Sequence, residues 1–135
     1  MSLAEQKSDY LLLIRGTDWD HGLSPEQIQQ VMNKMMSWFD SMHQQGVIKA
    51  GQPLGMEGVT ISGKQGRTVA DGPFAESKEA VGGYIILHVA DMGEAVRIAR
   101  EFPCLECGVT VEVRPIADEC PTFKRVKEQL EQATA

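Results

Sequence analysis

The chain has 135 residues, a hydrophobic share of 42% and a formal net charge of -6 at pH 7. This composition excludes a disordered chain, and the net acidity without a basic run argues against nucleic acid or an anionic membrane surface as a partner. No apolar run approaches the roughly 20 residues of a membrane span, and the N-terminus lacks the pattern of a secretion signal. We therefore expect one cytoplasmic domain over residues 1–135, with its core at about 9–117.

The first part of the chain predicts a strand followed by a long helix. Residues 10–15 form a short apolar run that is typical of a strand. Ser24 is a good N-cap, Pro25 suits the first helical position, and Gln27 stands where a capping box requires it. The predicted helix ends at Gly46 and carries one apolar stripe, made of Ile28, Val31, Met32, Met35, Phe39 and Met42.

The rest of the chain predicts further strands and two more helices. Strands are expected at 47–54, 84–90 and 109–116, and a hairpin at 59–62 and 67–70 with its turn at 63–66. A helix capped by Asp91 precedes the last strand, and a C-terminal helix is expected at about 120–133. This order predicts the α+β class, as a ferredoxin-like split βαβ sandwich with an extra β-hairpin and a C-terminal helix.

Strand alternation assigns side chains to the two faces of this sheet. The helix-covered face receives the apolar set Ile85, Leu87, Val89, Val109, Val111 and Val113. The opposite, open face receives side chains that could bind a ligand or transfer a proton, namely Arg15, Tyr84, His88, Glu112 and Arg114. Leu11, Leu13 and Ile86 share that face, and an apolar open face needs a cover. A second copy of the chain is the simplest cover, so we expect a homodimer.

The open face supports two hypotheses of different classes. In an enzyme without a cofactor, His88 or His21 would move protons on a small organic ligand. Glu112 would orient or share the proton, and Arg15 or Arg114 would hold an anionic group near Tyr84. In a binding module, the same pocket would hold a ligand and report it to a transcription regulator.

Simpler interpretations of these residues stay open. Glu112 and Arg114 lie two residues apart on one strand and could form only a solvated charge pair. His88 could be a half-buried histidine with a structural hydrogen bond. A dimer without any ligand is a third possibility.

The three cysteines are an odd number, which suits reduced thiols better than a disulfide framework. Cys104 and Cys107 have the CxxC spacing but follow a predicted helix, whereas a redox pair would precede one. Cys120 would be only a third zinc ligand, with no histidine nearby. Since no glycine-rich phosphate loop is present either, we expect no metal and no organic cofactor.

The most distinctive stretch is residues 71–79, with the sequence Asp-Gly-Pro-Phe-Ala-Glu-Ser-Lys-Glu, followed by Gly82, Gly83 and Tyr84. Asp71, Gly72, Pro73 and Phe74 are predicted to form a rigid turn in which Gly72 permits a positive φ. Glu76 and Lys78 would then be presented as ligand-binding side chains. The alternative is that the motif only shapes the fold.

This motif resembles the signature of the DGPF, or YCII-related, domain family, and residues 10–14, 24–26 and 111–115 resemble other parts of it. The resemblance implies pairing as a dimeric α/β-barrel. Most members of the family have no assigned reaction, and some occur beside extracytoplasmic-function sigma factors, which implies a regulatory setting. Some relatives carry a His-Asp pair proposed as catalytic. Here His21 with Asp18 or Asp20 lies in the first loop, without a residue-by-residue match to that pair.

Overall fold

The computed structural model describes residues 6–72 and 80–134. Along the chain the larger elements are β1 (Ser8–Arg15), α1 (Pro25–Gln44), β2 (Ile48–Pro53), β3 (Val59–Ser62), β4 (Thr68–Asp71), β5 (Val81–Val89), α2 (Met92–Arg100), β6 (Thr110–Pro115) and α3 (Pro121–Thr134). Two short 3-10 turns, η2 (Lys64–Gly66) and η3 (Pro103–Cys107), complete them. Glu76, Lys78, Pro73 and Phe74 lie outside the described residues.

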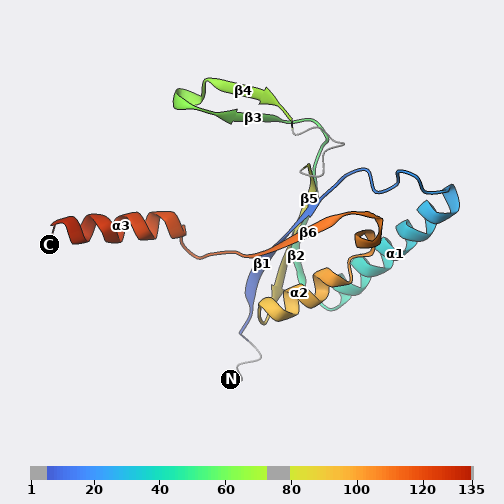
Figure 1. The fold of residues 1–135 in the computed structure, drawn as a ribbon. Coiled ribbons are helices and arrows are strands. Elements are labelled where there is room, and N and C mark those ends of the chain that lie inside the picture. The colour runs from blue at the N-terminus through green and yellow to red at the C-terminus, as the bar shows by residue number, and fades with distance from the viewer. Residues whose placement is uncertain (1–5, 73–79, 135) are drawn as a thin grey trace.

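The main sheet has four strands in the order β2-β5-β1-β6, and every neighbouring pair is antiparallel. Helix α1 connects β1 to β2, and α2 connects β5 to β6, so each helix crosses over a strand that lies between the two it joins. This is the split βαβ arrangement, and the predicted ferredoxin-like α+β fold is confirmed. Figure 1 shows both helices on one side of the sheet.

Helix α1 begins as the sequence predicts. The Ser24 hydroxyl accepts a hydrogen bond from the Gln27 backbone N–H (3.2 Å), and the Gln27 side chain accepts one from the Ser24 N–H (2.9 Å). This capping box satisfies two of the backbone donors that a helix start leaves without partners. Gly46 follows the helix with a φ of 70°, which favours glycine.

The buried side of α1 differs from the predicted stripe. The buried residues of the helix are Val31, Trp38 and Met42, whereas Met32 is 45% exposed. At 100° per residue, the centre of the buried side is rotated by about 50° from the centre of the predicted stripe. The reason is Trp38, whose large ring packs edge-on against Phe102 with 5.3 Å between ring centroids.

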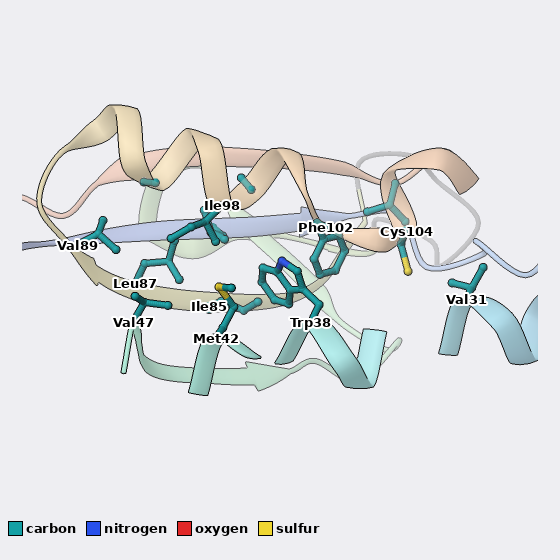
Figure 2. Packing of buried hydrophobic residues seen from close by; sticks show 14 residues of the cluster. Val31, Trp38, Met42, Val47, Ile85, Leu87, Val89, Ile98, Phe102 and Cys104 are labelled. Carbon is teal, nitrogen blue, oxygen red and sulfur yellow. The ribbon is translucent and has the colours of Figure 1, made fainter. Parts of the chain in front are cut away.

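The core lies between the sheet and the two helices. From the sheet, Leu12, Ile85, Leu87 and Val89 point toward the helices, as alternation predicts. Helix α2 buries Ala95, Ile98 and Ala99 against them, and its Asp91 cap accepts a hydrogen bond from the Glu94 N–H (2.9 Å). Phe102 is buried just after the helix ends. Figure 2 shows Trp38, Phe102 and Ile98 closing the helix side of this core.

Two elements project from this sandwich. Figure 1 shows the β3–β4 hairpin extending from one end of the sheet and α3 extending away from it on a separate segment. Large apolar side chains on both are exposed, among them Val59, Ile61, Val69, Phe123 and Leu130. Within the described parts of the chain, no helix is long and apolar enough to cross a membrane.

Candidate functional site

The registers of β1 with its two neighbours assemble the open face in rows. Asp9 lies opposite His88, and Leu11 lies between Ile86 and Arg114. One pair further along, Leu13 lies between Tyr84 and Glu112, and Arg15 follows opposite Thr110. The open face therefore has polar residues at both ends of β1, with half-buried Leu11, Leu13 and Ile86 between them.

One end of this face holds a hydrogen-bonded cluster of Asp9, Lys49 and His88. His88 Nδ1 lies 2.8 Å from Asp9 Oδ1, and Lys49 Nζ lies 2.6 Å from Asp9 Oδ2. The three residues come from β1, β2 and β5, so the cluster spans three adjacent strands. The side chain of His88 is 46% exposed and that of Asp9 is 25% exposed, so the imidazole is accessible while the carboxylate is largely covered.

The ionisation of the Asp9 carboxyl group determines which nitrogen of His88 carries a proton. The side-chain hydrogen bond from Lys49, followed by that from His88, holds the pKa of Asp9 below its usual value of 3.8. An ionised carboxylate has no proton to donate, so the hydrogen in this bond belongs to His88 Nδ1. In a neutral imidazole the lone pair then lies on Nε2, which is the arrangement that a general base requires.

The other end of the face holds Glu112 between two arginines. Arg15 Nη2 donates to Glu112 Oε1 at 3.0 Å, and Arg114 Nη1 lies 3.7 Å from Glu112 Oε2. The side chain of Arg114 is 67% exposed, so its guanidinium is accessible to an anion. The contact of Glu112 with Arg114 is the charge pair that the simpler interpretation described, and Arg15 adds a second partner from the neighbouring strand. A catalytic role of Glu112 stays a prediction.

His21 lies in an exposed loop after the end of β1, whereas His88 lies opposite Asp9 near the start of that strand. The six residues from Asp9 to Arg15 span about 20 Å of extended chain, so the loop of His21 begins at the other end of β1. A catalytic role of either histidine stays a prediction.

Of the predicted turn at Asp71 to Phe74, the structure describes only Asp71 and Gly72, and Gly72 has the predicted positive φ. Gly72 has a φ of 120°, a region that favours glycine, and its N–H donates to the Gly58 carbonyl at 3.0 Å. Asp71 is the last residue of β4. The ligand-binding roles of Glu76 and Lys78 stay predictions, because both lie outside the described residues.

The three cysteines are free thiols with different exposure. Cys104 is buried, Cys107 is half-buried and Cys120 is exposed. Burial, with the nearby Cys107 and Glu106, raises the pKa of Cys104 to about 11, so its thiol stays neutral at physiological pH. Within residues 6–72 and 80–134, no group of three or more His, Cys, Asp or Glu side chains could hold a metal ion.

Asp9 and Lys49 are the site residues that the sequence analysis missed. The first strand begins at Ser8 and not at Tyr10, and this extension puts Asp9 on the same face as Leu11. Alternation would have found Asp9 if the strand had been extended by two residues. Lys49 lies at an irregularity of β2 between Ile48 and Ala50, where alternation does not predict the face.

The sheet order, the two covering helices and the charged open face define a small ferredoxin-like α+β protein. The model of the YCII-related domain matches residues 8–122, so the chain belongs to the YCII-related domain family. No curated protein matches the sequence. Among solved structures, a hydroxynitrile lyase from Passiflora edulis aligns with a TM-score of 0.33 and 10% identity, over 86% of this chain and 98% of that one. A likeness of that degree supports no inference about the reaction.

Proposed function

We propose that this protein is an acid–base catalyst for a small organic molecule bound on the open sheet face, without a cofactor. The hydrogen bond of His88 Nδ1 to Asp9 carries the proposal, since it orients the imidazole and leaves Nε2 for proton transfer. Asp9 holds the ring, Lys49 holds Asp9, and neither needs to touch the ligand.

Arg114 is proposed to bind an anionic group of that molecule. It lies opposite Leu11, which is one row of the open face away from Asp9, and most of its side chain is exposed. His88 and Arg114 lie on the two strands that flank β1, about 10 Å apart across the sheet, and they are offset by two residues, about 7 Å, along it. The resulting backbone separation of about 12 Å suits a ligand that places a carboxylate on the guanidinium and its reacting atom near His88. Such a base can remove the proton of a weakly acidic C–H bond beside a carbonyl and return it.

A second copy of the chain is proposed to enclose the ligand. Leu11, Leu13 and Ile86 form an apolar centre on the open face, and the helices cover only the opposite face. Packing two open faces against each other would bury these side chains and exclude water from the Asp9–His88 pair. Exclusion of water strengthens the electrostatic interactions on which such catalysis depends.

A thermal-shift screen against small carboxylic acids, phenols, quinones and sugars tests the proposal. A ligand at about 100 times its dissociation constant adds about 2.7 kcal/mol to the free energy of unfolding. We expect a hit with the wild type that is lost with Arg114→Ala and kept with His88→Gln. Proton exchange of that ligand with D2O, followed by NMR, is expected with the wild type and absent with His88→Gln.

His21→Gln is the matched control, because it removes the other candidate histidine from an exposed loop. It is expected to exchange protons at the wild-type rate. Loss of exchange with His21→Gln and retention with His88→Gln would overturn the assignment. Binding without exchange in any variant would favour the alternative, a ligand-binding module that acts with a transcription regulator such as an extracytoplasmic-function sigma factor.

A further inference from the structure

A cavity of about 910 Å³ lies on the helix side of the sheet, away from the open-face cluster. It runs along β2 from Ile48 to Pro53 and on to Leu54, and it is bounded by Met35 and Phe39 of α1 and by Trp19 of the loop before that helix. Its described lining includes Lys49 and Tyr84 but not Asp9, His88 or Arg114. Its volume lies in the range of pockets that enclose small organic ligands.

Two glycines of the sheet open this cavity. Gly83 shares the helix side of β5 with Ile85, and Gly51 lies opposite Ile85 on β2. A side chain at either position would fill the space below α1. The neighbouring backbone disfavours one, because an added Cβ would lie 2.9 Å from the Tyr84 carbonyl oxygen at Gly51 and 3.0 Å from the Gln52 carbonyl oxygen at Gly83.

The rotation of α1 provides the opposite wall. Since Val31, Trp38 and Met42 occupy the core, the centre of the predicted apolar stripe, at Met35 and Phe39, faces the cavity instead. Both side chains are half-buried. The helix thus presents apolar side chains to a space that its own sheet leaves unfilled.

The chemistry of the lining selects the kind of ligand. Aromatic and aliphatic groups dominate, and the buried Cys104 contributes a neutral thiol. The ammonium group of Lys49 is hydrogen-bonded to Asp9 on the other face of the sheet. Helix α1 contributes one further ionisable group to the lining, the imidazole of His43. The described lining contains no carboxylate, so a cation would lose its hydration here without gaining an opposite charge, and an anion would meet only the imidazole of His43.

We infer that this cavity is a binding site for an uncharged, largely apolar ring compound, separate from the acid–base site on the open face. Gly51 and Gly83 leave the sheet side of the cavity without side chains at these two positions. Trp19 and Phe39 supply aromatic surfaces for stacking against a planar ring. This inference does not depend on the proposed reaction.

The test uses N-phenyl-1-naphthylamine, an uncharged ring compound whose fluorescence rises in apolar surroundings. We expect saturable binding of one probe molecule per chain. Met35→Trp places a larger ring in the cavity and is expected to weaken binding at least tenfold. Met36→Trp is the matched control, since Met36 is the next residue, is 64% exposed and does not line the cavity. It is expected to bind within twofold of the wild type.

A second measurement needs no variant. With methionine methyl groups labelled with 13C, the probe is expected to shift the resonance of Met35 and to leave that of Met36 unchanged. Equal weakening by both tryptophan variants, or shifts at Met36 alone, would overturn the inference and place the probe on exposed apolar surface. His88→Gln is expected to bind the probe like the wild type, so failure of the proposed reaction leaves this test intact.

Discussion

Asp9 is the residue on which the open-face cluster depends. It accepts hydrogen bonds from the side chains of Lys49 and His88, one on each carboxylate oxygen. Both bonds favour the ionised form, and desolvation opposes them more weakly, so the pKa of Asp9 is lowered overall. A chain that loses this carboxylate loses the orientation of the imidazole and the anchor of the lysine together.

The lowered pKa of Asp9 predicts a change in acid stability. A group with a lowered folded-state pKa stabilises the fold above its unfolded value, near 3.8, and this contribution is lost as pH falls through the folded value. Asp9→Asn is therefore expected to lower the free energy of unfolding at pH 6 and to flatten its decline below about pH 4. Urea unfolding between pH 3 and pH 7 measures both effects.

Glu94→Gln is a suitable control for that experiment, because Glu94 accepts the Ala90 N–H outside the cluster. The control is expected to leave the effect of Asp9→Asn unaltered when the two are combined. If the free energies of unfolding of the wild type and of Asp9→Asn changed with pH in parallel, the hydrogen bonds to Asp9 would not persist in solution.

Helix α1 illustrates what local signals decide at the level of an element. Its capping box, its proline at the first turn and its glycine end all lie in the sequence, and all three have the predicted geometry. Its rotation about its own axis does not follow from periodicity, because Met35 and Trp38 are both apolar and either could define the buried side. Packing of Trp38 on Phe102 decides between them.

The capping box predicts a measurable contribution to stability. Ser24→Ala removes the acceptor of the Gln27 N–H and is expected to lower the free energy of unfolding by about 1 kcal/mol. Ser37→Ala, an exposed position within the same helix, is expected to change it by less than about 0.5 kcal/mol. Urea unfolding of both variants checks this, and equal effects would assign the loss to something other than the cap.

At the scale of the whole molecule, the described residues leave several large apolar side chains exposed or only half-buried. They include the half-buried centre of the open face, the exposed β3–β4 hairpin and the exposed stripe of Phe123, Val126 and Leu130 on α3. The last three are spaced by three and four residues, which puts them on one side of the helix. Exposed apolar patches of this kind mark contacts with other molecules.

The proposed homodimer makes a specific prediction about these surfaces. Ile86→Lys places a charge at the centre of the open face and is expected to convert a dimer into a monomer in sedimentation equilibrium at micromolar concentrations. Ile61→Lys makes the same change on the exposed hairpin and is expected to leave the dimer intact. A monomeric wild type, or dissociation by Ile61→Lys alone, would contradict packing through the open faces.

The sequence by itself determined the elements to within a few residues, the ferredoxin-like order and the faces of the residues predicted in β1, β5 and β6, because caps, periodicity and alternation are local properties. It also contained the motif of the YCII-related family, whose domain model matches residues 8–122. These signals brought Tyr84, His88, Glu112 and Arg114 to one face without any knowledge of the tertiary structure.

Only the tertiary structure decided which of those residues act together. His88 and Asp9 are 79 positions apart, and Lys49 and Asp9 are 40 apart, so no local pattern links them. Strand register and the irregularity in β2 bring them into contact. The cavity between the sheet and α1 has the same origin, since it depends on how Trp38 of α1 packs against Phe102 beyond the end of α2 and on Gly51 and Gly83, which lie on adjacent strands only when β2 pairs with β5.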